Sequence, residues 1–180
     1  MEALPNMLIR KSTVNDIDRI LNIFNMARVY MRANNNPNQW AGNYPGKEHI
    51  LLDIDNGNSY VGIDEKGQII MTFAFISGND PTYNIIDGRW LNNEPYGTIH
   101  RIASNGKKGG MLKAASEFCF QKINNIRIDT HKDNLPMLRA LENNGFQKCG
   151  IIICADGTPR LAFQKVKQPY NHHSMNITGK

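Results

Sequence analysis

The stretch "YGTIHRIASNGKKGGMLKAASEFCF", residues 96–120, joins an apolar, β-branched segment to a helical segment through three glycines and two lysines. The apolar segment predicts a strand over Tyr96–Ala103, and the segment after the glycines predicts a helix over Gly110–Lys122. The next β-rich segment predicts a second strand over Asn125–Asp129. Because a strand–helix–strand unit has a right-handed crossover, its two strands are expected to be parallel.

The glycine turn lies where such units gather their ligands, at the carboxyl end of the first strand. The start of a helix leaves backbone N–H groups unpaired and carries partial positive charge. Gly106, Gly109 and Gly110 let that backbone approach an anion without a Cβ clash, and Lys107 and Lys108 add positive charge. The turn therefore suits a phosphate or pyrophosphate, although a tight turn without a ligand fits the same residues. It matches neither G-x-G-x-x-G nor the P-loop, so dinucleotide and ATP sites are not expected.

The segments before this unit predict a strand, two helices and a hairpin. A short strand is expected in "MLIRKS", a helix from about Val14 to Ala33, and a second helix in "GKEHILLDID". The runs "SYVGID" and "IIMTFAFI", separated by a short glycine-containing turn, predict a β-hairpin. A long polar connection follows, with a short helix expected near Ile85.

The segments after the unit predict one more helix and a second hairpin. "LPMLRALENN" is expected to be helical, with Gly145 as its left-handed cap. "FQKCGIIIC" and "RLAFQKV" predict the hairpin. The fold class is therefore α/β, a single domain with a mixed, mostly antiparallel sheet and helices on both faces. We expect this domain to span residues 1–166, followed by a flexible polar tail over 167–180.

Composition narrows the possible functions. With 41% hydrophobic and 21% charged residues, the chain of 180 residues is typical of one globular domain. No segment is apolar enough to span a membrane and none resembles a secretory signal, so a cytoplasmic location and no membrane partner are expected. The net charge of +5 is scattered, so a nucleic-acid partner is not expected. The sequence leaves open whether the chain forms a homodimer.

Cysteine and histidine spacing gives no sign of a metal site. Cys119, Cys149 and Cys154 are odd in number and lack CxxC spacing, which argues against a disulfide framework and a structural zinc site. They are expected to be small buried apolar side chains. His172 and His173 are interpreted as part of the polar tail, so no metal ligands are assigned.

The segment "NIRIDTHKDNLPMLRALENNGFQKCGII" resembles the C-terminal half of the GNAT superfamily of N-acetyltransferases, with its strand, Asn-containing turn, helix, "GF" and final hairpin. The resemblance extends over about Met7 to Val166, and its most specific part is Arg127 to Phe146. "IHRIAS" and the glycine turn occupy the place of that family's acetyl-CoA motif. The resemblance implies a GNAT-like fold and transfer of an acetyl group from acetyl-CoA, as cosubstrate, to the amine of a small-molecule or amino-acid-like substrate.

The resemblance also implies where the cosubstrate lies. The backbone at Ile102, Ala103 and Ser104 would pair with the pantetheine arm, and the turn from Gly106 to Gly110, including Lys107 and Lys108, would hold the pyrophosphate. Asn134 matches an asparagine that often contacts the cofactor in the family.

Two residues depart from the family pattern. The turn motif [QR]-x-x-G-x-[GA] is best matched by "KKGGML", which places Leu112 where a small residue permits close approach. Leu141 stands where many members have a tyrosine that protonates the departing thiolate. These departures motivate an alternative function, a catalytically weak or inactive CoA-binding module. A nucleic-acid or ribosome-associated function rests only on the basic charge.

Acetyl transfer to an amine needs a proton acceptor, and His100 occupies the strand where the family often places one. A structural, hydrogen-bonded histidine is the alternative. Strand alternation predicts that Arg101 points to the opposite face. His131 is expected to serve in a turn or at the site, while Trp40 and Tyr44 are expected to wall the substrate pocket or to pack the first helices.

Overall fold

The structure is a computed structural model, and it describes residues 7–167. These residues form an eight-stranded sheet with the strand order β1-β2-β3-β5-β6-β8-β7-β4. The strands are β1 (Leu8–Lys11), β2 (Ser59–Ile63), β3 (Ile69–Ser77), β4 (Asp87–Gly88), β5 (Gly97–Ser104), β6 (Asn125–Thr130), β7 (Gln147–Ile153) and β8 (Pro159–Val166). The helices are α1 (Ile17–Ala33), α2 (Lys47–Asp55), α3 (Met111–Cys119) and α4 (Leu135–Asn143), with 3₁₀ turns at Val14–Asp16 and Pro81–Tyr83.

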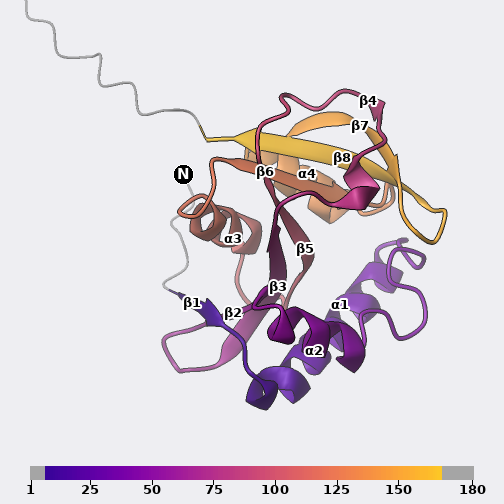
Figure 1. The fold of residues 1–180 in the computed structure, drawn as a ribbon. Helices are drawn as coiled ribbons and strands as arrows, with labels where there is room; N and C mark the ends of the chain where they lie inside the picture. The colour runs from indigo at the N-terminus through magenta and orange to yellow at the C-terminus, as the bar shows by residue number, and fades with distance from the viewer. Residues whose placement is uncertain (1–6, 168–180) are drawn as a thin grey trace, which may run out of the picture.

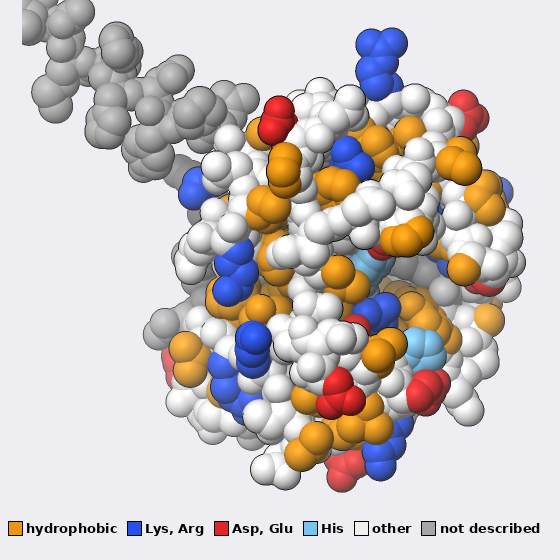
Figure 2. Space-filling model, viewed as in Figure 1, with side chains coloured by type: hydrophobic (Ala, Val, Ile, Leu, Met, Phe, Trp, Pro, Cys, Tyr) orange, Lys and Arg blue, Asp and Glu red, His pale blue; other side chains and the backbone are white. Residues whose placement is uncertain are grey.

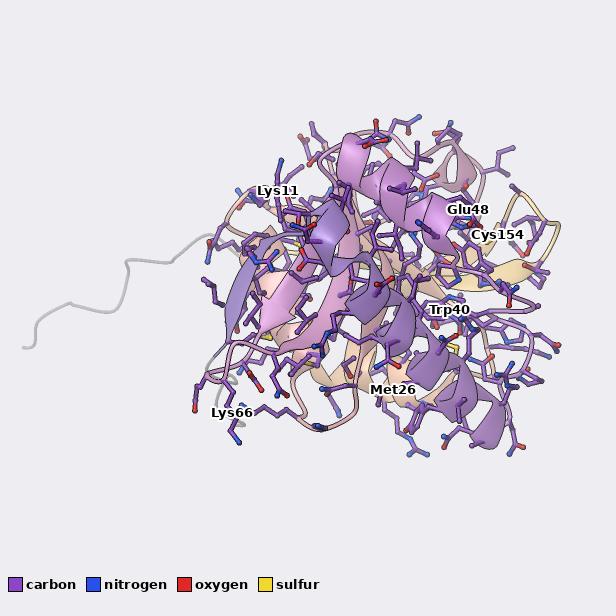
Figure 3. The ribbon with its side chains drawn as sticks, turned by 90° about the horizontal axis from the view of Figure 1, so that it is seen from below. Lys11, Met26, Trp40, Glu48, Lys66 and Cys154 are labelled. Atoms are coloured by element: carbon purple, nitrogen blue, oxygen red, sulfur yellow. The ribbon has the colours of Figure 1, made fainter. Side chains whose placement is uncertain are left out.

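The helices cover both faces of this sheet because its strands carry apolar side chains on both (Figure 1). On β2, Tyr60 packs in the core cluster under α3 and α4, while its neighbour Val61 packs under α1 and α2. Figure 3, seen from below, shows α1 and α2 in front of the sheet. A third cluster lies on the α1–α2 face at the β4–β5 connection and includes Tyr83, Trp90 and Ala162. The expected α/β fold with helices on both faces is confirmed.

The parallel pair predicted from the glycine turn is present but short. β5 and β6 pair only at Gly97↔Ile126 and Thr98↔Arg127, although β5 continues to Ser104. Beyond these positions the two strands run apart (Figure 1). In the part of the chain that the structure describes, the edge of β5 that faces β6 is therefore open from Ile99 onward.

A bulge interrupts β5 on its other side, where it pairs with β3. Ala74 pairs with His100 and Thr72 with Ala103, so a single residue of β3 faces two residues of β5. Arg101 is the inserted residue and has a left-handed φ of 51°. Because the bulge breaks alternation, Arg101 does not face the opposite side from His100; its side chain bonds to α2, on the α1–α2 face. The predicted orientation of Arg101 was wrong for this reason.

The other expected elements agree with the structure, with three local differences. The two hairpins, the four longer helices and the left-handed Gly145 (φ 74°) are confirmed. The helix expected near Ile85 is instead the 3₁₀ turn at Pro81–Tyr83, β4 was not expected, and α3 ends at Cys119. The predictions for His172, His173 and most of the tail lie outside the described residues.

Within residues 7–167, no helix has the length and apolar character to cross a membrane. The same residues contain no group of three or more histidine, cysteine, aspartate or glutamate side chains placed to hold a metal ion.

Candidate active site

The candidate site lies where β5 leaves β6, on the face covered by α1 and α2. The loop after α1 (residues 34–46), the β3–β4 connection and the β6–α4 turn all contribute contacts here. Figure 2 shows two histidine side chains among hydrophobic ones on this side of the molecule, one recessed and the other at the surface.

His100 is paired with a carboxylate that sequence reasoning missed. Its Nε2 lies 2.9 Å from Oδ2 of Asp80, and both side chains are largely buried. Asp80 is itself fixed, because its Oδ1 accepts from the Thr82 N–H at 2.9 Å and its own N–H donates to the hydroxyl of Tyr96 at 2.9 Å. The hydrogen bond from His100 lowers the pKa of Asp80, outweighing the effect of burial. Since a carboxylate only accepts, Nε2 carries the hydrogen, and the lone pair of a neutral His100 is at Nδ1.

A second hydrogen-bonded pair lies beside His100. The hydroxyl of Tyr83 donates to Oδ1 of Asp129, near the end of β6, at 2.6 Å. Burial, with the nearby Asp129, raises the pKa of Tyr83 well above its usual value, so the phenol stays protonated. The ring of Tyr83 lies 6.1 Å from that of His100, which brings the two pairs into one site.

The two predicted aromatic wall residues have different environments. Trp40 is 7% exposed and packs edge-on against Phe24 of α1 at 5.3 Å, so it belongs to the core under α1. Tyr44 is 38% exposed and packs against His49 at 4.8 Å. Of the pair, Tyr44 is the one with surface to offer a ligand.

The glycine turn has free backbone donors. The N–H groups of Gly106 and Lys107 donate to the side chains of Ser104 and Asn105 at 3.3 and 3.1 Å. The N–H groups of Lys108, Gly109 and Gly110 have no partner in the described part of the chain. Gly106 and Gly110 have φ angles of 72° and 76°, and α3 begins directly after Gly110. The turn thus combines free amides, exposed lysine side chains and a helix start.

Asn134 caps α4 and contacts the loop after α1. Its Oδ1 accepts from the Met137 N–H at 3.2 Å, and its Nδ2 donates to Oε1 of Gln39 at 2.9 Å. An amide nitrogen carries two hydrogens, and the second has no acceptor within residues 7–167. The part played by Gln39 was not predicted, because hydrogen bonding across the fold leaves no pattern in the sequence.

The residues that depart from the family pattern both lie in the core. Leu112 is 6% exposed and faces the core from the first turn of α3, so its side chain does not cover the glycine turn. Leu141 is fully buried in the same cluster and offers no proton. The Nδ1 of His131 accepts from the Asp133 N–H at 3.2 Å, which is a turn contact.

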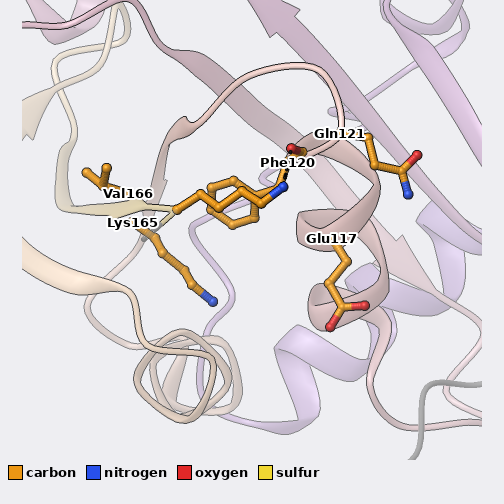
Figure 4. Close-up of a pocket in the computed structure, with 6 residues that line it drawn as sticks. Glu117, Phe120, Gln121, Lys165 and Val166 are labelled. Carbon is orange, nitrogen blue, oxygen red and sulfur yellow. Dashed lines mark hydrogen bonds between the residues drawn. The ribbon is translucent and has the colours of Figure 1, made fainter. Parts of the chain in front are cut away.

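A pocket of about 430 Å³ lies away from this site, at the C-terminal end of α3 (Figure 4). It is lined by Glu117, Phe120, Gln121, Lys165, Val166 and Lys167. The ammonium of Lys165 donates to the Asn144 carbonyl at 2.6 Å and that of Lys167 to the Phe120 carbonyl at 3.4 Å. The ammonium groups of Lys165 and Lys167 are already hydrogen-bonded, and the glycine turn lies at the opposite end of α3. This pocket is therefore not the candidate active site.

Solved structures of other proteins share this fold. The chain is 32% identical to a GNAT-family acetyltransferase from Streptococcus agalactiae, with a TM-score of 0.83 over 93% of this chain and 99% of that one. A candidate acetyltransferase from Staphylococcus aureus shares the fold at 24% identity and a TM-score of 0.65, over 88% of this chain and 98% of that one. A GNAT-family acetyltransferase from Bacillus cereus also shares the fold, at 17% identity and a TM-score of 0.56, over 91% of this chain and 99% of that one. No protein-family profile and no curated protein matches the sequence.

The chain shares its mixed sheet, which opens between two parallel strands beside a glycine turn and a helix, with these acetyltransferases, and the 32% identity places it among enzymes that transfer acyl groups. The chain belongs to the GNAT family of acetyltransferases.

Proposed function

We propose that the protein transfers the acetyl group of acetyl-CoA to the amine of a small-molecule or amino-acid-like substrate, with His100 as the proton acceptor. The observation that carries this proposal is the open edge of β5, which leads directly into the glycine-turn amides that have no partner within residues 7–167.

The backbone geometry supports the proposed binding of the acetyl donor, acetyl-CoA. Residues Ile102 to Ser104 lie on the open edge, where an extended pantetheine arm can add main-chain hydrogen bonds as a further strand would. The N–H groups of Lys108, Gly109 and Gly110, which no described residue accepts from, suit a pyrophosphate, with Lys107 adding charge at the rim. Acetyl-CoA supplies an activated acyl carbon; these residues bind and orient it.

His100 supplies the proton acceptor. An amine arrives largely as its ammonium form, and the lone pair at Nδ1 can take one proton, directly or through water. The freed nitrogen lone pair then forms the C–N bond to the acyl carbon, and the electrons of the breaking C–S bond leave on sulfur. The proton that the nitrogen loses on becoming an amide neutralises that sulfur, so no acid at Leu141 is required for the atoms to balance.

The fully buried Leu141 favours a second candidate, a module that binds CoA with little or no turnover. Both candidates predict that CoA raises the melting temperature, because a ligand of the native state stabilises it. Only the enzyme consumes acetyl-CoA when an amine is added.

The test measures acetyl-CoA consumption across a panel of amines and amino acids, with His100→Gln as the variant. Glutamine can still hydrogen-bond to Asp80 but cannot accept the proton. We expect kcat/KM to fall about 10²-fold or more with CoA affinity unchanged. If His100→Gln stays within about twofold of the wild type, the proton acceptor is another group.

A further inference from the structure

Arg101, the residue after His100, holds a backbone conformation that is unusual for a residue with a side chain. Its φ of 51° lies in the left-handed region, at the bulge of β5. Glycine ordinarily occupies a left-handed bulge position, because it has no Cβ to clash. A residue held there is strained, and the contacts around it must offset the strain.

The offsetting contact is an ion pair with α2. The Nη2 and Nε of Arg101 donate to the two carboxylate oxygens of Asp53 at 2.6 and 3.0 Å. The side chains are only 16% and 11% exposed, so solvent screens the pair little. Burial alone would lower the pKa of Arg101, but Asp53, together with Tyr44, outweighs it and raises the pKa. The guanidinium therefore stays charged, in the two-bond geometry that is strongest for this type of pair.

This ion pair fixes the segment of β5 that has the least strand pairing within the sheet. Among the described residues, β5 has no pairing strand on its β6 side from Ile99 onward, and at the bulge its pairing with β3 is interrupted. Arg101 lies inside that segment, directly after the proposed proton acceptor and before the residues proposed to receive the pantetheine arm. Its link to α2 is a tertiary contact that fixes the segment from outside the sheet.

We infer that Arg101 is a positioning residue, whose ion pair with Asp53 sets the open edge of β5 for the acyl donor. This inference rests on the proposed function, because it takes the open edge as the acetyl-CoA site. Arg101 is not assigned contact with the reacting atoms. Its effect is on where the neighbouring backbone lies.

The test separates the ion pair from the backbone conformation and from stability in general. Arg101→Gly removes the guanidinium but accepts the left-handed φ without strain, and Arg101→Lys keeps the charge but loses the paired bonds. The matched control is Arg10→Ala, which breaks another two-bond pair, Arg10 with Asp16 at 2.7 and 2.9 Å, near the start of the fold. CoA affinity is measured by titration calorimetry and stability by urea unfolding.

We expect Arg101→Gly to weaken CoA binding about tenfold, Arg101→Lys to lie between it and the wild type, and Arg10→Ala to lose stability without losing CoA affinity. Because Arg101→Gly leaves the buried Asp53 unpaired, the double variant Arg101→Gly/Asp53→Asn is measured too; it should fold and bind CoA no more tightly than the single variant. Unchanged CoA affinity in Arg101→Gly or in the double variant overturns the inference, as does an equal loss in Arg10→Ala. A wild type that does not bind CoA overturns the proposed function itself, and this inference with it.

Discussion

The side chains of Gln39 and Asn134, 95 positions apart in the chain, are joined by a hydrogen bond of 2.9 Å from Asn134 Nδ2 to Gln39 Oε1. The same oxygen of Gln39 accepts from Asn36 Nδ2 at 2.9 Å, and Asn36 and Asn134 are both buried. The loop after α1 is therefore fixed to the start of α4. The contact joins the loop that carries Trp40 and Tyr44, expected at the substrate pocket, to Asn134, expected to contact the cosubstrate.

Removing the acceptor should destabilise the fold. In Gln39→Ala the buried amides of Asn36 and Asn134 each lose a partner, so we expect the free energy of unfolding to fall by about 1–3 kcal/mol. Urea unfolding measures the change. The control is Asn38→Ala, one position earlier and exposed, which should stay within about 0.5 kcal/mol of the wild type. Equal effects of the two variants would show that the hydrogen bonds of Gln39 add nothing to stability.

The glycine turn can be tested with a pair of glycines in the same conformation. Gly106 and Gly157 have φ angles of 72° and 78°, and an added Cβ would meet nothing within 4 Å at either. Alanine at each should therefore cost a similar amount of stability, about 1–2 kcal/mol, from the left-handed conformation alone. Only Gly106→Ala should also weaken CoA binding, because it shifts the turn amides. If the two variants bind CoA equally well, the turn is not the pyrophosphate site.

Sequence patterns were sufficient to predict the helices and strands, but not the contacts between them. The β5–α3–β6 unit was predicted because β-branched runs, glycine clusters and helical periodicity are local signals. The bulge was not, because it arises from pairing with β3, and it reversed the expected direction of Arg101. The family resemblance located the turn, but it could not show that Leu112 faces the core from the first turn of α3.

The partners of the site residues were the hardest to predict. Asp80 precedes Pro81, and this pair of residues indicates a turn. The sequence gives no sign that the Asp80 carboxylate reaches His100, 20 positions later. Asp53 and Gln39 are similar cases. Each is a polar residue whose role depends on the packing of α2 and of the loop after α1 against the sheet.

The pKa of Asp80 predicts how stability depends on pH. The hydrogen bond from His100 lowers this pKa in the folded protein relative to the unfolded chain. The pair's contribution is therefore fully present above the pKa of an unfolded aspartate, about 3.9, and is lost as pH falls through the lower folded value. The stability difference between wild type and Asp80→Asn should be largest above about pH 5 and shrink toward pH 3. A difference that does not vary with pH in urea unfolding would contradict this.

The raised pKa of Cys154 can be tested by the reactivity of its thiol. Burial, with a smaller effect of Asp129, raises the pKa of Cys154 to about 11. At pH 8 only about one thousandth of this thiol would be thiolate, so alkylation by iodoacetamide should be slow and should accelerate as pH rises. Cys149 and Cys119 also have raised pKa values because of burial. Mass spectrometry of the native protein measures the modification, with the urea-unfolded chain as control; rapid labelling of native Cys154 at pH 8 would contradict the prediction.

Asp80→Asn should impair catalysis through the position of one proton. Asp80 accepts from Nε2 of His100, which leaves the lone pair of the neutral ring at Nδ1. Asparagine is nearly the same size, but its amide can donate to Nε2, which favours the tautomer with hydrogen on Nδ1 and removes the lone pair from that atom. We expect kcat/KM to fall about 10²-fold, with CoA affinity and the fold preserved. Asp80→Glu keeps a carboxylate and should retain more activity than Asp80→Asn, which separates charge and acceptor chemistry from packing. If the two variants are equally active, Asp80 holds the β3–β4 connection in place and does not orient the base.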